Sequence, residues 1–318
     1  MNDLTGVIPI TATPFDADGR VDEDSIVALV EFEARCGVHG LNVLGIMGEF
    51  HKLTESERRR VAEIFIKSAA GRFPVVVGTS HAGTGACIEL SQAAEAAGAA
   101  AVMVAPPPGL RGDGAILAHY LAVAAAVSVP IVVQDEPVTT GVIMPPDLLA
   151  RIANELPACR YVKLEEPPTP TKITALRRLP GGERFRIFGG MNGMFFVEEL
   201  SRGAVGIMTG VAVPDVLVRI YDLFRAGDAA GAAAMYDRYA SYIRYEGQQG
   251  IGLALRKEVL RLRVAIRSSY VRPPGPSLDD VTRAELRAML ERTQLIEPEA
   301  HLGGRGPRSA TDRGARQP

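Results

Sequence analysis

Residues 41–77 read LNVLGIMGEFHKLTESERRRVAEIFIKSAAGRFPVVV, and the pattern of this stretch indicates the architecture. A short apolar run, Leu41–Leu44, precedes a longer segment with helical spacing, and a second β-branched run begins at Pro74. Thr54 and Glu57 have the spacing of a capping box, which predicts a helix over residues 54–70. The stretch is therefore predicted to be one strand–helix–strand unit with parallel strands.

The same alternation recurs along most of the chain. Eight short apolar runs, without antiparallel hairpin signals between them, predict an α/β fold with a parallel sheet. Their even spacing favours a closed (β/α)8 TIM barrel over an open doubly wound sheet. The Gly-x-Gly-x-x-Gly fingerprint of a nucleotide-binding sheet is missing after the first run, where the chain reads TATPFDADG. The eight runs are Val7–Thr11, Leu41–Leu44, Pro74–Val77, Ala101–Val104, Pro130–Val133, Tyr161–Leu164, Arg186–Phe188 and Val205–Met208.

Three parts are expected along the chain. The barrel is assigned to residues 1–225, close to the ~250 residues typical of this fold. Helix-like segments at Ala229–Arg244, Leu253–Ser268 and Thr282–Arg292 predict a C-terminal helical extension over residues 226–300, packed outside the barrel. Residues 301–318 are rich in Gly, Arg and Pro and are predicted to be disordered.

Composition excludes several classes of function. The 318 residues include 35 basic and 37 acidic side chains, a balance that predicts neither nucleic-acid binding nor a basic membrane-binding face. Leu121–Val133 is the longest apolar stretch and is too short to span a bilayer. Cys36, Cys87 and Cys159 are too far apart for a metal motif, and the first residues lack a signal-peptide pattern. We expect a cytoplasmic protein with reduced thiols and no metal.

One lysine stands out among the polar residues at the expected strand ends, where barrel active sites lie. Lys163 shares a strand face with Glu165, whereas Leu164 points to the other side. Burial should lower the pKa of a lysine facing the barrel interior from ~10.4, and a neutral amine attacks a ketone to form an imine. Glu165 is then a candidate acid and base beside the imine. A buried Lys–Glu pair without chemistry is the alternative.

These residues lie in segments that resemble the dihydrodipicolinate synthase / N-acetylneuraminate lyase family of class I aldolases. Lys163 matches the family's Schiff-base lysine. The resemblance implies a small-molecule 2-oxo acid substrate, no cofactor and a homotetramer. It extends from Val7 to about Pro274 and is carried by GVIPITATPFDADGRVD, LGIMGEFHKLTESER, VVQDEPVTTG, YVKLEEP and GAVGIMTG.

The resemblance also assigns a substrate site. The family's Gly-Thr-Thr-Gly-Glu run reads GIMGE here, so Gly48 and Glu49 match while both threonines are absent. With those hydroxyls lost, we expect the N–H groups of Met47 and Gly48 to bind the substrate carboxylate as a small anion nest. Gly190, aligned with a one-residue shift, and Met208 match positions whose backbone lines the pyruvate-like site.

Departures from the family pattern narrow the expected reaction. Gln134 replaces the catalytic tyrosine, and Thr139 replaces the arginine that holds a carboxylate in the lysine-biosynthetic enzymes. Synthesis of dihydrodipicolinate, or of its 4-hydroxy-tetrahydro form, is therefore disfavoured. The replacements resemble one branch, the 2-keto-3-deoxy sugar acid dehydratases and L-2-keto-3-deoxyarabonate dehydratase in particular. The shared features are VQD-x-P, Lys-x-Glu, Thr-Ser-His at residues 79–81 and the late segment IGLALRK.

The resulting hypothesis is dehydration through an imine. Lys163 attacks the C2 ketone, Glu165 removes a C3 proton, and water leaves from C4. Retro-aldol cleavage to pyruvate would instead need a base on the C4 hydroxyl, and Gln134 has no titratable group. The distal hydroxyls are assigned to strand-end polar residues, for which loop capping is the alternative. These residues are His81, Asp135, Thr139 and Asn192.

Three rival functions follow from the same residues. A plain pyruvate-dependent class I aldolase would use the same imine for cleavage. A non-catalytic relative that binds a sugar acid would explain the lost threonines and tyrosine. A metal-dependent barrel enzyme lacks HxH or HExxH spacing, and only five histidines are present. Its conceivable ligands are Glu49, His51, His81, Asp135 and Glu136.

Overall fold

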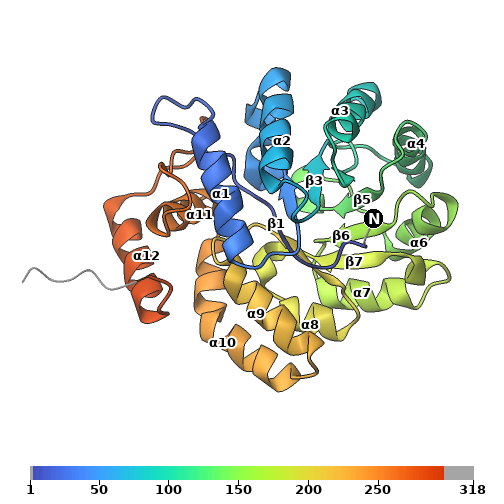
Figure 1. The fold of residues 1–318 in the computed structure, drawn as a ribbon. Helices are drawn as coiled ribbons and strands as arrows, with labels where there is room; N and C mark the ends of the chain where they lie inside the picture. Colours follow the sequence, from blue (N-terminus) through green and yellow to red (C-terminus); the bar gives the residue numbers. More distant parts are fainter. Residues whose placement is uncertain (1–2, 297–318) are drawn as a thin grey trace, which may run out of the picture.

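Eight parallel strands form one sheet that closes into a barrel (Figure 1). The computed structural model describes residues 3–296. Neighbouring strands pair in the order β1-β8-β7-β6-β5-β4-β3-β2, and a parallel bridge between Ile10 and Asn42 joins β1 to β2. The predicted (β/α)8 TIM barrel is thereby confirmed, and the open doubly wound sheet is excluded. The strands are β1 (Gly6–Pro9), β2 (Leu41–Val43), β3 (Val75–Gly78), β4 (Ala101–Val104), β5 (Ile131–Asp135), β6 (Tyr161–Leu164), β7 (Arg186–Gly189) and β8 (Gly206–Thr209).

Helices surround the strands (Figure 1). The helices up to residue 225 are α1 (Glu23–Arg35), α2 (Glu55–Ala69), α3 (Thr84–Ala96), α4 (Asp113–Ala124), α5 (Pro137–Thr140), α6 (Pro146–Glu155), α7 (Thr169–Arg177), α8 (Phe196–Ser201) and α9 (Pro214–Arg225). Then come α10 (Ala229–Glu246), α11 (Gly252–Leu262) and α12 (Asp280–Arg292). Short 3-10 turns are η1 (Ile46–Gly48), η2 (Phe50–Lys52), η3 (Gly182–Arg184) and η4 (Met191–Gly193).

Alternation along the strands determines what faces the barrel interior. On β6, Tyr161 lies in the buried barrel core together with Phe188 from β7 and Met208 from β8. Side chains two residues apart point the same way, so Lys163 follows Tyr161 on the inner face. The outward-facing residues Val162 and Leu164 instead belong to the larger apolar layer between strands and helices. The barrel interior is therefore apolar at the level of Tyr161 and polar at the carboxyl ends of the strands.

The C-terminal extension differs from prediction in one place. The helix expected over residues 253–268 ends at Leu262. Val264 adopts a left-handed φ of 58°, and the Ala265 N–H donates to the Leu260 carbonyl at 2.8 Å, as in a Schellman C-cap. That bond terminates the helix although the sequence continues with helical spacing. The boundary at residue 225, where α9 ends, remains a proposal, and the tail at residues 301–318 lies outside the described range.

The capping box predicted at the start of α2 is present. The Thr54 hydroxyl accepts the Glu57 N–H at 3.2 Å, and Glu57 accepts the Thr54 N–H at 2.9 Å. Because loss of such a cap leaves orphan N–H groups, Thr54→Ala is expected to lower the free energy of unfolding by about 1 kcal/mol. Urea denaturation followed by circular dichroism measures this change, and Thr54→Ser is the matched control that keeps the hydroxyl. An equal loss in both variants would contradict the capping role.

Candidate active site

A buried ion pair stands at the carboxyl end of β6. Lys163 Nζ lies 2.8 Å from Glu165 Oε2, and the two residues are 5% and 9% exposed. Gln134 is the cross-strand neighbour of Lys163, and its Nε2 donates to Glu165 Oε2 at 3.3 Å. The Met191 N–H donates to the other carboxylate oxygen at 3.4 Å. Lys163, Glu165 and Gln134 therefore form one hydrogen-bonded group on the inner face of the barrel.

Gly190 makes room for this group. A Cβ at Gly190 would lie 2.5 Å from both Cγ and Oε1 of Glu165, a distance at which the carboxylate would have to move. Gly190 thus lies against Glu165, on the side of the site formed by β7. The resemblance assigned Gly190 to the substrate site, whereas in the structure the side chain nearest to it is that of Glu165.

A cavity of about 520 Å³ opens onto the ion pair at the mouth of the barrel. Its wall includes six residues of the predicted site, namely Met47, Gln134, Thr139, Lys163, Glu165 and Asn192. These come from the ends of β5 and β6, from α5, and from the 3-10 turns η1 and η4 that follow β2 and β7. The arrangement agrees with the general rule that barrel active sites lie at the carboxyl ends of the strands.

Three other predicted residues are turned away from this cavity. Met208 is fully buried in the barrel core below the site. Asp135 follows Gln134 and so faces outward, where Lys172 Nζ contacts its Oδ2 at 2.6 Å. His81 uses Nδ1 to accept the Gly83 N–H at 3.0 Å in the turn before α3. The prediction that His81 and Asp135 contact distal hydroxyls is therefore not supported by their positions.

One of the two donors of the expected carboxylate nest is used by a local turn. The Gly48 N–H donates to the Gly45 carbonyl at 2.9 Å within η1, so it is already engaged. The Gly48 carbonyl in turn accepts the Thr13 hydroxyl at 2.6 Å. Met47, by contrast, lines the cavity. The part of the prediction that depends on Gly48 is wrong in this conformation, because a local turn bond uses the donor.

Glu49 is a structural anchor rather than part of the cavity wall. Its side chain is fully buried and contacts the Lys257 ammonium, while Lys52 Nζ lies at 3.0 Å. It also accepts the Arg272 N–H at 3.0 Å. The predicted contact of Glu49 with substrate is corrected accordingly, because two ammonium groups and a backbone N–H already surround its carboxylate.

Several residues of the cavity were missed from the sequence. Arg256, from α11, binds Glu246 Oε1 through Nε at 2.6 Å and Asn192 Oδ1 through Nη2 at 2.7 Å. Lys52 and Thr209 also line the cavity, as does His51, which the sequence suggested only as a conceivable metal ligand. The sequence signal for Arg256 is the IGLALRK segment alone, because Arg256 lies on a helix of the extension and not at a strand end.

Two buried carboxyl groups lie on the helix side of β5 and β7, the strands that flank β6. Burial raises the pKa of Asp135 to about 6, although Lys172 opposes the shift. Burial also raises the pKa of Glu199 to about 7, with partial opposition from the Thr169 hydroxyl, which donates at 2.6 Å. Glu199 is fully buried behind Gly189 of β7. The folded state therefore favours the neutral form of both carboxyls relative to the unfolded chain.

A pH-dependent stability follows from Glu199. Its pKa is raised in the folded state from an ordinary 4.5, so its contribution is fully present below pH 4.5 and is lost as pH rises to about 7. Glu199→Gln should remove this loss and increase the free energy of unfolding at pH 8 by about 1–3 kcal/mol relative to the native chain. Urea titrations between pH 4.5 and 8 measure it, with the exposed neighbour Glu198→Gln as control. An unchanged slope in Glu199→Gln would refute the assignment.

A metal centre is not assembled from the described residues. No group of three or more His, Cys, Asp or Glu side chains in residues 3–296 is placed to hold a metal ion. Glu49 and Asp135, two of the conceivable ligands, are bound to lysines instead. Over the same range, no helix combines the length and the apolar character needed to cross a membrane.

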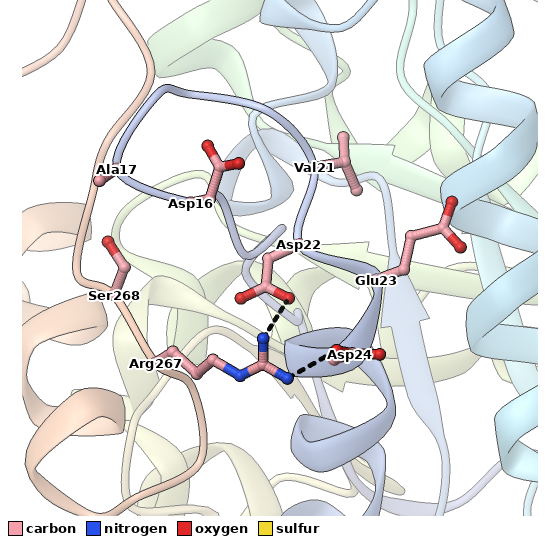
Figure 2. A pocket seen from close by; sticks show the side chains of 8 residues that line it. All are labelled: Asp16, Ala17, Val21, Asp22, Glu23, Asp24, Arg267 and Ser268. Carbon is pink, nitrogen blue, oxygen red and sulfur yellow. Dashed lines mark hydrogen bonds and ion pairs between the residues drawn. The ribbon is translucent and has the colours of Figure 1, made fainter.

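A second hollow lies between the segment after β1 and residues 267–268 and contains none of the predicted site residues. Figure 2 shows Arg267 between Asp22 and Asp24, with Asp16 and Glu23 nearby. Arg267 Nη2 binds Asp24 at 2.7 Å, and Asp22 caps α1 by accepting the Ser25 N–H at 3.0 Å. These carboxylates are engaged in capping and ion pairing, so the hollow offers no comparable chemistry.

Comparison with known proteins identifies the family. A profile of the Dihydrodipicolinate synthetase family matches residues 3–293. L-2-keto-3-deoxyarabonate dehydratase from Azospirillum brasilense is 33% identical over 293 residues, covering 90% of this chain and 94% of that protein. The crystal structure of dihydrodipicolinate synthase from Rhodopseudomonas palustris has a TM-score of 0.86 at 41% identity, covering 91% of this chain and 97% of the other.

A third relative is relevant to the chemistry of the site. YagE from Escherichia coli K12 was crystallised in complex with pyruvate, and its structure has a TM-score of 0.85 at 28% identity. The match covers 92% of this chain and 99% of that one. The profile match, the sequence relatives and the shared fold agree over nearly the whole length. The chain belongs to the dihydrodipicolinate synthetase family and is a lyase of the Schiff-base-forming class.

Proposed function

We propose that this lyase dehydrates a 2-keto-3-deoxy sugar acid of the L-2-keto-3-deoxyarabonate type through an imine on Lys163. The observation that carries the proposal is the buried 2.8 Å contact between Lys163 Nζ and Glu165 Oε2 at the floor of the cavity. The proposal is supported by the 33% identical dehydratase from Azospirillum brasilense. It is also supported by Gln134, the third member of the hydrogen-bonded group, because its amide has no titratable group.

Imine formation needs a neutral amine and a proton carrier. Transfer of one proton from Lys163 to Glu165 across their contact supplies both. The amine attacks C2 of the keto acid, and the carbonyl oxygen takes the proton from Glu165. Glu165 then accepts a proton from the nitrogen and returns it to the departing hydroxyl, so that one water leaves. The products of this step are a protonated imine and an ionised Glu165.

Dehydration uses the same two groups. The protonated imine withdraws electrons from C3, and the Glu165 carboxylate removes one C3 proton to give an enamine. The enamine electrons then expel the C4 hydroxyl, which leaves as water with the proton from Glu165. Movement of a proton from C5 to C3 gives an enol, the enol becomes the aldehyde as its hydroxyl proton moves to C4, and hydrolysis of the imine releases 2-oxoglutarate semialdehyde and regenerates Lys163. Each proton taken by Glu165 is returned, so the carboxylate is restored after each turnover.

The competing reaction is retro-aldol cleavage between C3 and C4. Cleavage requires a base on the C4 hydroxyl, and the side chain that shares Glu165 with the amine is Gln134, which has no titratable group. Glu165 Oε2 lies 2.8 Å from Lys163 Nζ, so it is placed to exchange protons with the imine nitrogen and with the carbon next to the imine carbon. These contacts favour removal of a C3 proton over removal of the C4 hydroxyl proton.

Product analysis tests the proposal. The purified chain is incubated with a panel of 2-keto-3-deoxy acids, and 2-oxoglutarate semialdehyde and pyruvate are measured separately. L-2-keto-3-deoxyarabonate should give the semialdehyde without pyruvate. Pyruvate with glycolaldehyde would replace the dehydratase by an aldolase, and ligand-induced thermal stabilisation without any product would indicate a binding protein without turnover. A homotetramer and a cytoplasmic location remain predictions, the first of which light scattering tests.

A further inference from the structure

A buried arginine in the cavity wall has an unused donor. Arg256 is 2% exposed and lines the same cavity as Lys163. Its Nε binds Glu246 at 2.6 Å and its Nη2 binds Asn192 at 2.7 Å. Within residues 3–296, Nη1 has no hydrogen-bond partner. A charged donor that is buried without an acceptor is costly, so this nitrogen is expected to have a partner when the site is filled.

The guanidinium is held rigidly at its position. Glu246, which is fully buried, also accepts the Ala212 N–H at 3.1 Å and contacts the Tyr242 hydroxyl. Asn192 is fixed in turn, because its Nδ2 donates to the Ile243 carbonyl at 2.8 Å. Partners of this kind remove the rotamer freedom that an arginine would otherwise lose on binding a ligand. Nη1 is therefore a pre-organised donor.

A glycine allows the guanidinium to reach the barrel mouth. Gly210 directly follows β8 and is the next inward position after Met208, and a Cβ there would lie 2.2 Å from Nη1 and 3.2 Å from the Ile10 carbonyl oxygen. Gly210 also lines the cavity. Arg256 thus lies over the carboxyl ends of β8 and β1, although α11 supplies it from outside the barrel.

The location of Nη1 separates it from the keto acid end of the substrate. Met47, the proposed contact of the carboxylate beside the ketone, follows β2, and β2 lies opposite β6 in the closed strand order. When the substrate is joined to Lys163 and its carboxylate points toward Met47, its remaining carbons extend to one of two sides of the cavity. The side of Gln134 and Thr139 offers no cation and carries the Glu136 carboxylate, whereas the side of β7 and β8 carries Arg256, whose buried Nη1 has no partner among the described residues.

We propose that Arg256 Nη1 binds the terminal oxygen of the substrate, at the end of the chain remote from the imine. The inference rests on the proposed function and adds a substrate class to it, namely 2-keto-3-deoxy acids whose last carbon carries a hydroxyl or a second carboxylate. Acids without that oxygen, such as pyruvate, form the imine without using Arg256. Arg256 is a specificity-determining residue in this assignment, and Gly210 is the position that keeps its donor in place.

Competition for Lys163 tests the assignment without requiring turnover. Pyruvate is trapped on Lys163 with borohydride and detected by mass, and L-2-keto-3-deoxyarabonate is added as competitor. In Arg256→Gln and Arg256→Lys, the competitor concentration for half-protection should rise about tenfold to a hundredfold, because a hydrogen bond from a charged donor is lost. The pyruvate concentration for half-trapping should stay within about threefold. A diacid of the same length, run in parallel, shows which terminal oxygen is preferred.

Two further variants keep the test decisive. Gly210→Ala retains Arg256 but displaces Nη1, so it should weaken the sugar acid and spare pyruvate in the same way. Arg261→Gln changes an arginine of the same helix that pairs with Glu258 at 2.7 Å. It should alter neither the trapping of pyruvate nor the protection by the sugar acid. Thermal denaturation shows that each variant is folded.

Equal weakening of pyruvate and sugar acid in the Arg256 variants would overturn the assignment, since it would place Arg256 at the shared keto acid end. No weakening of either would overturn it as well. Failure of the proposed function looks different. In that case the unmodified chain traps no pyruvate, or it converts the sugar acid to other products, before any variant is compared.

Discussion

Lys163→Met is expected to abolish the borohydride-dependent mass adduct with pyruvate and to lower kcat/KM for the sugar acid by about 10⁴-fold or more. Without the amine no imine forms, and the C3 proton loses the electron sink that makes it acidic. The adduct is measured on the intact protein and then located by peptide mass mapping. Retention of activity within tenfold, or an adduct on another lysine, would remove the mechanism.

The control must separate chemistry from stability. Removing only Lys163 leaves the 9% exposed carboxylate of Glu165 without its cation, and such a change destabilises buried pairs by about 3–5 kcal/mol. The double variant Lys163→Met with Glu165→Gln removes both charges and should recover most of that stability while remaining inactive. Lys172→Met is a matched substitution in a second buried lysine, which pairs with Asp135 behind the strand. It should leave the pyruvate adduct intact.

Glu165→Gln is expected to lower kcat for dehydration by about 10²–10⁴-fold, the usual range for a general acid–base group. The amide keeps the shape of the carboxylate but cannot take the C3 proton, whereas Lys163 still reaches the keto carbon. Trapping of pyruvate should therefore persist, although it becomes slower. Rapid-quench measurement of product and adduct in the same samples gives both rates.

A carboxylate in the same cavity provides the comparison for Glu165. Glu136 lines the cavity, and its side chain caps α5 by accepting the Thr139 N–H at 3.0 Å. Glu136→Gln should change kcat by less than about threefold, since an amide oxygen can accept the same bond. If both variants lose dehydration equally, or if Glu165→Gln loses the adduct completely, Glu165 is not the group that moves the C3 proton.

The strands and the ion pair were predictable because they depend on short-range periodicity. Apolar runs at even spacing indicated all eight strands, with ends that differ by at most two residues from the structure. Lys163 and Glu165 share a face because they are two residues apart on one strand, and no tertiary information is needed for that conclusion. The same alternation would have placed Asp135 outside once Gln134 was assigned to the interior.

Other parts of the site could not be predicted from local pattern. Glu49 was assigned to the substrate because its position in the GIMGE run suggested it, but its partners Lys257 and Arg272 lie more than 200 residues away in the chain. Arg256 comes from a helix whose register over the barrel mouth depends on the packing of α10 and α11. Long-range contacts of this kind leave no periodic signal in the sequence.

The attachment of Glu49 to Lys257 has a consequence for the order in which this enzyme matures on the ribosome. The loop after β2 emerges early, but the lysine that neutralises its buried carboxylate is synthesised 208 positions later. A nascent chain that already carries all eight strands still lacks Lys257 and Arg272, the distant partners of Glu49. Competence to hold substrate is thus acquired only after Lys257 has been synthesised, and truncation before residue 257 should yield a barrel with an unfinished entrance.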